Sequence, residues 1–479
     1  MKPSTLGELR STEWSVRAGE SVKDEMRGNL IRKLQAGETI LPGIIGYEDT
    51  VIPQIVNAVL SRHNFILLGL RGQGKTRILR QLIGLLHPEL PVISGSEIND
   101  DPFFPASIEG KKILQEKEDS TPISWLPREV RYIEKLATPD VTVADVVGDI
   151  DPIKASKFGV GLGDPRSIHY GLLPRANRSI FAMNELPDLA GKVQVALFNI
   201  MQERDVQIKG YPMRLPLDLM LVFSANPEDY TARGKIITPL KDRVGSEIRT
   251  HYPNTLNEGM QITKQEAWLN RGVEVRVPEF IAEIIEEVGF QARDDSRVDK
   301  HSGVSQRLAI SLMENVISNS EQRAFQNNEM EPMIRTSDLH EALSAITGKI
   351  ELEYEGELKG GEFVAKAIVQ KAIGQVFARW LNNIDTSEIV GYFQDDNSLR
   401  VPTTGAIGGL SKLFEKIPGL IEVSQAIVST SADINEVAVV AEFVLEGLCA
   451  RKQIGRSQER GYVSLGPEAE RESNQTNWN

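Results

Sequence analysis

The residues with the clearest chemical meaning run from Gly69 to Thr76 and follow the pattern G-x-x-x-x-G-K-[ST]. The glycines of this stretch, Gly69, Gly72 and Gly74, let successive backbone N–H groups turn inward around phosphate oxygens. Lys75 would then reach the β- and γ-phosphates of a nucleotide, and Thr76 would ligate Mg²⁺. The pattern therefore predicts a phosphate-binding loop.

The sequence around this loop has the order of elements that such a loop requires. An apolar run, Phe65 to Leu68, predicts a strand directly before it. After it, apolar residues recur on one face of a predicted helix that stops at His87-Pro88. A glycine-rich turn without a ligand is the alternative, and this context disfavours it.

A second candidate strand end lies at Asn184 and Glu185, after an apolar run that begins at Ser179. Nucleotide hydrolysis needs a strand end that faces the Mg²⁺ and the attacking water, and we expect this strand beside the first one. Glu185 would orient or deprotonate the water, whereas Asn184 stands where a carboxylate usually holds the water shell of Mg²⁺. An amide accepts such a hydrogen bond without adding charge, which predicts weaker metal binding and slower hydrolysis. A core strand with a polar cap is the alternative, and the strand alone leaves both open.

The elements that follow favour a catalytic strand end. Leu189–Met201 is a predicted helix, Val206–Leu215 a predicted hairpin, and Leu219–Ala225 a predicted buried strand that ends at Asn226. The Asn226 amide would reach the γ-phosphate or the water. Arg243 follows a helix-like run and is either a surface ion-pair partner or an arginine finger from a neighbouring subunit, which is worth about 10³–10⁵ in rate where it operates.

An α/β domain must position these residues. From about residue 44 to 253, strand-like runs alternate with amphipathic helical patterns, which predicts a parallel sheet flanked by helices and buried on both faces. Its strands are expected at Asn64–Gly69, Pro91–Ser94, Ser179–Asn184 and Leu219–Ala225.

Helical regions are expected on either side of this domain. Residues 1–43 form an N-terminal helical segment, and the spacing of apolar residues predicts a helical domain over 254–350. The acidic run Glu351 to Glu357 is most simply a solvated linker to a further helical region, 351–453. Residues 454–479 are polar, which indicates a mobile tail.

Composition limits the classes of function. The chain has 479 residues, a formal charge of −13 and a single cysteine, Cys449. The charge argues against broad attraction to nucleic acid or anionic lipid, and the apolar runs are too short to span a membrane. One cysteine excludes an internal disulfide and a multi-thiolate metal site, which is typical of a reducing cytoplasm. We therefore expect a cytoplasmic protein with protein partners, without membrane insertion and without nucleic acid.

Taken in order, several segments resemble one family. From about residue 44 to 350, the chain resembles the AAA+ ATPases of the clade that holds the magnesium-chelatase I subunit and the MoxR proteins. The resemblance rests on "IIGYEDT" at 44–50, "GLRGQGKT" at 69–76, "HYGLLPRANRSIFAMNEL" at 169–186, "VQVALFNIMQERDVQIKG" at 193–210, "FSANPED" at 223–229, "PLKDR" at 239–243 and "SQRLAISL" at 305–312. In the same order, these are similar to the family's adenine-side motif, its Walker A loop, the segment leading into Walker B, the helix and hairpin that follow, sensor 1, the arginine-finger position and sensor 2.

The resemblance implies a P-loop AAA+ core followed by a helical lid, with ATP and Mg²⁺ as cofactors. It implies that Ile44, Ile45 and Gly46 lie near the adenine, that Asn226 is sensor 1 and that Arg307 contacts the γ-phosphate. It also implies a homo-oligomeric ring, a hexamer, in which Arg243 acts in trans. Insertions around residues 144–166 and 204–217 would touch the substrate or partner. Asn184 departs from the family's Walker B aspartate, and the region beyond about residue 351 lies outside the resemblance.

Three functions are compatible with these residues. The first is an ATP-dependent remodelling motor or chaperone that hydrolyses ATP and acts on a protein client, for which a von Willebrand-domain protein is one candidate. The second is a nucleotide-gated assembly scaffold with slow turnover, which Asn184 favours. The third is the ATPase subunit of a magnesium chelatase proper, whose other subunits would be separate chains. An enhancer-dependent transcription activator is disfavoured, because its Gly-Ala-Phe-Thr-Gly-Ala loop is absent from the sequence.

Overall fold

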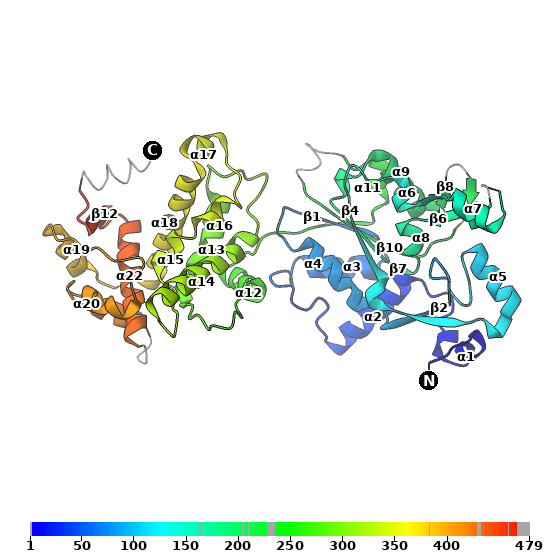
Figure 1. The fold of residues 1–479 in the computed structure, drawn as a ribbon, viewed down its shortest axis with the longest axis horizontal. Helices are drawn as coiled ribbons and strands as arrows, with labels where there is room; N and C mark the ends of the chain where they lie inside the picture. The colour runs from blue at the N-terminus through cyan, green and yellow to red at the C-terminus, as the bar shows by residue number, and fades with distance from the viewer. Residues whose placement is uncertain are drawn as a thin grey trace. The chain divides into compact units, whose positions relative to one another are not determined.

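The computed structural model describes residues 2–161, 164–203, 206–208, 211–213, 215–227, 235–382, 384–428, 433–457 and 459–466, without the side chains of residues 165 and 202–214. The chain forms two compact units, Met1–His251 and Tyr252–Asn479, which are described separately (Figure 1). Within the described ranges, no helix has the length and apolar character needed to cross a membrane.

The first unit is built on a parallel sheet of five strands. In spatial order these are β11 (Ser246–Arg249), β1 (Phe65–Leu68), β10 (Leu219–Ala225), β7 (Ser179–Asn184) and β4 (Tyr132–Leu136). Every residue of β1, β7 and β10 is buried, as expected for central strands covered on both faces. The predicted α/β fold with a parallel sheet flanked by helices is confirmed.

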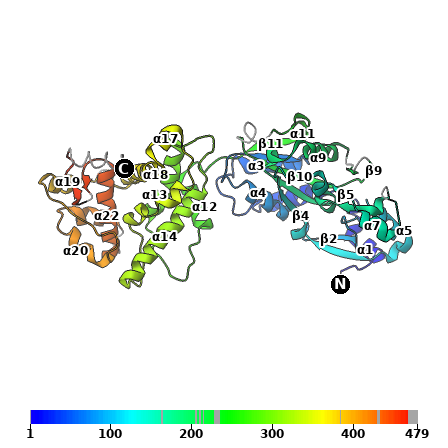
Figure 2. The same cartoon turned by 45° about the horizontal axis from the view of Figure 1, so that its top comes forward.

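Helices cover both faces of this sheet, as the ribbon views show (Figures 1 and 2). One face packs against α2 (Val22–Ala36), α3 (Val51–Leu60) and α4 (Lys75–Gln81). The other packs against α6 (Val143–Val146), α8 (Leu172–Arg175), α9 (Gly191–Glu203) and α11 (Thr238–Arg243). Successive side chains of a strand point to opposite faces of the sheet, so each strand contributes alternately to the two cores. Leu67, for example, belongs to the first core and Leu68 to the second.

One expected strand of the sheet was assigned wrongly. Pro91–Ser94 does not join the parallel sheet; β2 (Glu89–Ile93) pairs antiparallel with β3 (Ile123–Pro127) in a separate two-stranded sheet. Leu6 and Leu9 of the N-terminal helix α1 (Leu6–Arg10) form a small apolar cluster with Ile123 of this pair. Every residue of β2 after Glu89 is buried. The helix α5 (Ile108–Lys117) lies in the connection from β2 to β3.

The expected neighbour of the phosphate-loop strand was also wrong. The strand β7, which ends at Asn184, does not pair with β1, because β10 lies between them and pairs with both. The end of β10, at Asn226, is therefore interposed between the phosphate loop and Glu185. On its far side, β7 pairs with β4.

Short elements follow or interrupt the sheet strands. The predicted hairpin is confirmed, since β8 (Val206–Ile208) pairs antiparallel with β9 (Tyr211–Met213). A second small pair joins β5 (Gly148–Ile150) to β6 (Ile168–Tyr170), with α7 (Pro152–Phe158) between them.

The N-terminal segment is part of the first unit's core. Helix α2 buries Val22, Met26 and Leu30 against the sheet layer, and it is held by a buried ion pair. Both guanidinium NH groups of Arg131 bind the carboxylate of Glu25, at 2.8 and 2.6 Å. Because both side chains are almost fully buried, this pair fixes the helix to the segment that leads into β4.

In its described residues the second unit is helical, with one small strand pair. Its helices are α12 (Leu256–Glu266), α13 (Glu279–Asp294), α14 (Arg307–Asn327), α15 (Thr336–His340), α16 (Leu343–Thr347), α17 (Tyr354–Lys359), α18 (Gly361–Trp380), α19 (Ser387–Gln394), α20 (Ser411–Phe414), α21 (Leu420–Ile427) and α22 (Ile434–Ala450). They are followed by the antiparallel strands β12 (Gly455–Ser457) and β13 (Gly461–Val463).

One hydrophobic core runs through the whole second unit. It includes residues from Ala267 to Tyr462, so the stretches 254–350 and 351–453 contribute to the same interior. Phe280 of α13 stacks on Phe443 of α22 with ring centroids 4.4 Å apart. A buried ion pair joins the same two stretches, since Arg335 Nε lies 2.8 Å from Glu442 Oε2.

The acidic run Glu351 to Glu357 is not a solvated linker. Leu352 packs against the core and pairs with Val298 in an isolated bridge, while the Glu351 carboxylate accepts a hydrogen bond of 2.6 Å from Ser302. Gly356 is buried in the first turns of α17, where a Cβ would collide with the carbonyl of Arg297. Leu352 and Gly356 therefore attach this run to the helices around it.

Candidate nucleotide-binding site

The predicted phosphate loop lies between β1 and α4, so the strand-loop-helix order is the one the pattern requires. Gly72 and Gly74 have φ angles of 74° and 72°, a left-handed conformation that glycine adopts without strain. Gly69 is required for a different reason, because a Cβ at this position would collide with Thr250 and Gln73. A Cβ at Gly74 would meet nothing within 4 Å, so the start of α4 is open to an approaching group.

Lys75 is buried and its ammonium group lies among oxygen acceptors. Its Nζ donates to the carbonyls of Gly69 and Leu70 at 2.5 and 2.9 Å, and to Asn226 Oδ1 at 2.7 Å. The side chain therefore curls over the loop toward the end of β10. An ammonium group held by neutral oxygens can exchange them for phosphate oxygens without leaving a buried charge unpaired.

Asn226 continues this chain of contacts to Glu185. Its Nδ2 donates to Glu185 Oε2 at 3.0 Å, so one amide joins the lysine of the loop to the carboxylate after β7. Glu185 has φ 54° and ψ 48°, a left-handed conformation that costs a non-glycine residue on the order of 1 kcal/mol. Such strain clusters at functional sites, where the surrounding structure over-determines it.

Asn184 occupies the last position of β7 and both ends of its amide are engaged. Its Nδ2 donates to Glu134 Oε1 of β4 at 2.6 Å, and its Oδ1 accepts from Ser224 Oγ of β10 at 3.0 Å. Glu134 was not foreseen from the sequence. The structure places a carboxylate in contact with the amide at the predicted metal-side position.

Arg80, in the last turn of α4, holds Glu134 from the other side. Its Nε lies 2.8 Å from Glu134 Oε2, and its NH2 lies 3.2 Å from Oε1. Hydrogen bonding to Glu134 raises the pKa of Arg80, and burial raises the pKa of the neighbouring Tyr132 phenol. Neither group loses a proton near neutral pH.

The segment 44–46 is joined to the loop by the residue that follows it. Ile44, Ile45 and Gly46 are partly buried, and the hydroxyl of Tyr47 lies 2.9 Å from the carbonyl oxygen of Gln73. The same hydroxyl lies 2.5 Å from the carbonyl oxygen of His251, the last residue of the first unit. Tyr47 thus ties the predicted adenine-side segment, the phosphate loop and the end of the unit together.

Two predicted arginines lie outside this cluster of contacts. Arg243 ends α11, pairs with Asp242 and lies over the Phe198 ring at 5.3 Å. Arg307 is the exposed first residue of α14 in the second unit, next to Gln306, whose Nε2 binds the buried Glu286 at 2.8 Å. The roles of both arginines remain predictions.

The predicted donors for Mg²⁺ are a hydroxyl and an amide. Thr76 is the second residue of α4 and Asn184 the last of β7. No group of three or more His, Cys, Asp or Glu side chains that could hold a metal occurs among the described residues. This donor set fits Mg²⁺, which keeps several waters and takes its remaining ligands from substrate phosphates, and it does not fit a metal that needs an all-protein cage.

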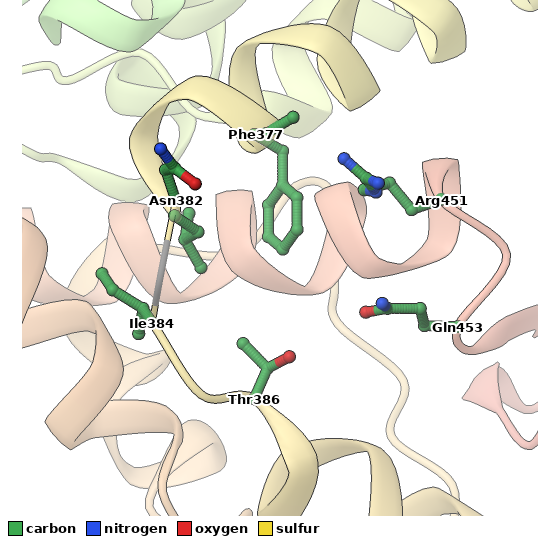
Figure 3. A pocket seen from close by; sticks show the side chains of 8 residues that line it. Phe377, Asn382, Ile384, Thr386, Arg451 and Gln453 are labelled. Atoms are coloured by element: carbon green, nitrogen blue, oxygen red, sulfur yellow. The ribbon is translucent and has the colours of Figure 1, made fainter.

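A hollow in the second unit is unrelated to the predicted residues. It has a volume of about 220 Å³ and is lined by residues of the α18 end, the following loop and the α22 end (Figure 3). Phe377 points into it, with Thr386 and Gln453 at its lower edge in this view. Arg451 caps the C-terminal end of α22, where a cation stabilises the helix dipole.

Comparisons with known proteins find similarity at the level of solved structures. Neither a protein-family model nor a curated protein sequence matches the chain. A complex between subunits BchI and BchD of magnesium chelatase aligns with 66% of this chain and 96% of its own, at 20% identity and a TM-score of 0.35. A putative ATPase from Cytophaga hutchinsonii aligns with 74% and 98%, at 18% identity and a TM-score of 0.29. NtrX from Brucella abortus in complex with ADP aligns with 78% and 69%, at 10% identity and a TM-score of 0.39.

Sequence reasoning found the loop, the two strand ends and their amides, and it missed the residues that connect them. Those missed residues are Tyr47, Arg80, Glu134, Ser224 and Thr250. Ser224 could have been identified from the sequence, because a hydroxyl in an otherwise apolar, buried strand needs a hydrogen-bond partner. Glu134 had no such signal, since its strand was not recognised.

Proposed function

We propose that this chain is an AAA+ ATPase that binds ATP with Mg²⁺ and couples hydrolysis to the remodelling of a protein partner. The observation that carries the proposal is the continuous contact from Lys75 through Asn226 to Glu185. A phosphate-binding lysine, a polar strand end and a carboxylate meet there, from three elements at one edge of a parallel sheet.

Each residue has a distinct task in this proposal. Lys75 binds the β- and γ-phosphates, and the loop glycines let backbone N–H groups surround them. Glu185 orients the attacking water as a general base, and Asn226 holds the Glu185 carboxylate in position. Thr76, and Asn184 through a water, would hold Mg²⁺, which would supply neutralisation of the phosphate charge. Ile44, Ile45 and Gly46 lie against the adenine, and Arg307 contacts the γ-phosphate.

The assembly and the partner belong to the same proposal. Arg243 acts in trans on the nucleotide of a neighbouring subunit, which requires a homo-oligomeric ring, proposed as a hexamer. Its place at the end of α11, with a half-exposed guanidinium that pairs with the adjacent Asp242, is compatible with a role in a neighbouring subunit's site. The single cysteine supports a cytoplasmic location, and the net charge of −13 supports a protein client, such as a von Willebrand-domain protein, over nucleic acid.

The test measures binding and turnover in matched variants. Lys75→Ala should weaken binding of a fluorescent ATP analogue by about 10–100-fold, because a buried charged donor to phosphate is lost. Lys111→Ala, at an exposed lysine of α5, serves as the control. Arg243→Ala should lower phosphate release by about 10³-fold or more while leaving affinity nearly unchanged.

A matched control exists for the arginine. Arg128 pairs with the adjacent Glu129 as Arg243 pairs with Asp242, and both arginine side chains are 39% exposed. Arg128→Ala should therefore leave turnover intact. Equal turnover in Arg243→Ala and Arg128→Ala would refute the finger, and unchanged binding in Lys75→Ala would refute the nucleotide site.

A second function is favoured by Asn184, which adds no charge beside Mg²⁺. In a nucleotide-gated scaffold, ATP would drive assembly with little turnover. Light scattering with ATP and with a non-hydrolysable analogue separates the two functions. A scaffold should assemble to the same extent with both nucleotides, whereas the assembly of a motor should dissociate once ATP is hydrolysed. A magnesium chelatase subunit would require a porphyrin-binding partner chain, which co-purification from native cells would identify.

A further inference from the structure

Glu134 and Asn184 face each other across neighbouring strands. In the β4·β7 register Glu134 lies opposite Ala182, and Asn184 is two residues further along β7, on the same face of the sheet. The small Ala182 side chain leaves room for Glu134 to lean toward the strand end. Its Oε1 lies 2.6 Å from Asn184 Nδ2, a short, charge-assisted hydrogen bond.

This contact decides which way the Asn184 amide points. A carboxylate only accepts hydrogen bonds, so the NH₂ group of the amide must face Glu134 on β4. The amide oxygen is then directed to the other side, toward β10, where it accepts from Ser224 Oγ at 3.0 Å. The strand β10 pairs directly with β1, the strand that leads into the phosphate loop.

Arg80 keeps the carboxylate in this place. Its guanidinium binds both oxygens of Glu134, and it belongs to α4, the helix that begins with Lys75 and Thr76. Glu134 is therefore fixed between the phosphate-loop helix and the end of β7. Ser224, Asn184 and Glu134 form a line across three strands, on the sheet face that α4 covers.

We propose that Glu134 is a positioning residue that holds the Asn184 amide oxygen toward the phosphate-loop side of the sheet, where it accepts a hydrogen bond from Mg²⁺-bound water. The inference rests on the proposed ATP and Mg²⁺ site. It gives Asn184 a different role, because the carboxylate of this site lies on the neighbouring strand β4 and not at the end of β7. The amide is the partner that a carboxylate on β4 requires.

If Glu134 and Asn184 act as a pair, single substitutions and the double substitution should have opposite effects. Asn184→Asp alone places two carboxylates in hydrogen-bond contact, where the like charges repel each other. Glu134→Gln alone replaces the carboxylate, which can only accept hydrogen bonds, with an amide, so the Asn184 side chain is free to flip its amide group. Combining Asn184→Asp with Glu134→Gln restores a carboxylate-amide pair with the two roles exchanged.

The experiment titrates Mg²⁺ at a fixed concentration of a fluorescent ATP analogue and measures bound analogue, without hydrolysis as a readout. We expect Glu134→Gln and Glu134→Ala to raise the Mg²⁺ midpoint by about 10-fold, the lower range for partners that orient metal ligands. Asn184→Asp should raise it by at least as much, and the double variant should return it to within about threefold of wild type. Binding of the analogue without Mg²⁺ should stay unchanged in all four, which also shows that they are folded.

Glu247→Ala is the matched control. Glu247 is a glutamate of the edge strand β11 in the same sheet, and it also has basic partners, Lys241 and Arg249. It should leave the Mg²⁺ midpoint unchanged. Midpoints that stay at the wild-type value in both Glu134 variants would overturn the inference, as would a double variant no better than Asn184→Asp. If wild-type protein binds no analogue at any Mg²⁺ concentration, the proposed function itself fails, which the binding curve shows before any variant is compared.

Discussion

The side-chain amide of Asn226 donates a hydrogen bond of 3.0 Å to the carboxylate of Glu185. The same amide accepts from Lys75, so the carboxylate and the ammonium are held by one group at the end of β10. Because β10 lies between β1 and β7, this contact is built into the strand order. It requires no movement of a loop.

Asn226→Ala is expected to uncouple binding from turnover. Lys75 keeps its carbonyl partners, so affinity for an ATP analogue should change by less than about fivefold. Phosphate release should fall by about 10²-fold, because Glu185 loses the donor that orients it. Asn64→Ala, at an asparagine that caps the opposite end of the sheet through Leu221 N, should leave turnover unchanged. Affinity that falls as much as turnover would contradict this role.

Tyr47→Phe is expected to weaken nucleotide binding modestly. The variant keeps the ring, which packs on His251 with centroids 4.8 Å apart, and removes only the hydroxyl that contacts the Gln73 carbonyl. Losing one such hydrogen bond costs about 1 kcal/mol, or about fivefold in the dissociation constant of the analogue. Tyr170→Phe, at a tyrosine of β6, is the control. An unchanged dissociation constant would show that the tie from Tyr47 to the loop is dispensable.

Asp218 should make the first unit less stable as pH rises. Burial raises its pKa to about 6, against the opposing effects of the Val22 N–H and of Arg178. An unfolded aspartate titrates near ~3.9, so between about pH 4 and 6 the folded state binds more protons than the unfolded state. This stabilising contribution is complete below about pH 4 and is lost through pH 6.

Asp218→Asn removes this dependence. The free energy of unfolding of the variant, measured by urea denaturation, should exceed that of wild type by on the order of 2 kcal/mol at pH 7.5. The difference should shrink toward zero at pH 4. A difference that stays constant over this range would show that Asp218 does not titrate with a raised pKa.

Removing one partner of the buried pair Arg335–Glu442 should lower the free energy of unfolding strongly, whereas replacing both partners with apolar residues should lower it little. Arg335→Met leaves Glu442 buried without its partner, which destabilises by about 3–5 kcal/mol. Combining Arg335→Met with Glu442→Leu should recover most of that loss, because both buried charges are gone. Urea denaturation followed by tryptophan fluorescence measures both. Lys359→Ala, in the exposed pair with Glu355, should change stability by less than about 1 kcal/mol.

The sequence predicts the parts of the site that follow uniform patterns. The fully buried strands β1, β7 and β10 were recognisable because nearly all of their residues are apolar, and an asparagine stands at the end of β7 and directly after β10. The edge strands were not. Tyr132–Leu136 reads as a mixed, charged segment because β4 has one neighbour only and is half-buried, and β11 carries Glu247 and Arg249.

The order of strands in the sheet and the contacts between them were harder to predict than the helices and strands themselves. Nothing in the chain order indicates that β10 inserts between β1 and β7, and this order is what joins Asn226 to Glu185. The contact between Glu134 and Asn184 spans 50 residues and depends on a strand register. Such contacts are set by the whole sheet, so local patterns leave them open.

The shared interior of residues 267–462 has a mechanical consequence. Arg307 begins α14, and α14 packs with α13, which packs with α18 and, through Phe280, on α22. A close-packed interior transmits a displacement instead of absorbing it. If Arg307 contacts a phosphate as proposed, a displacement of α14 would reach α18 and α22 through this interior. A chain cut after residue 350 would remove many of the apolar side chains that form the same interior.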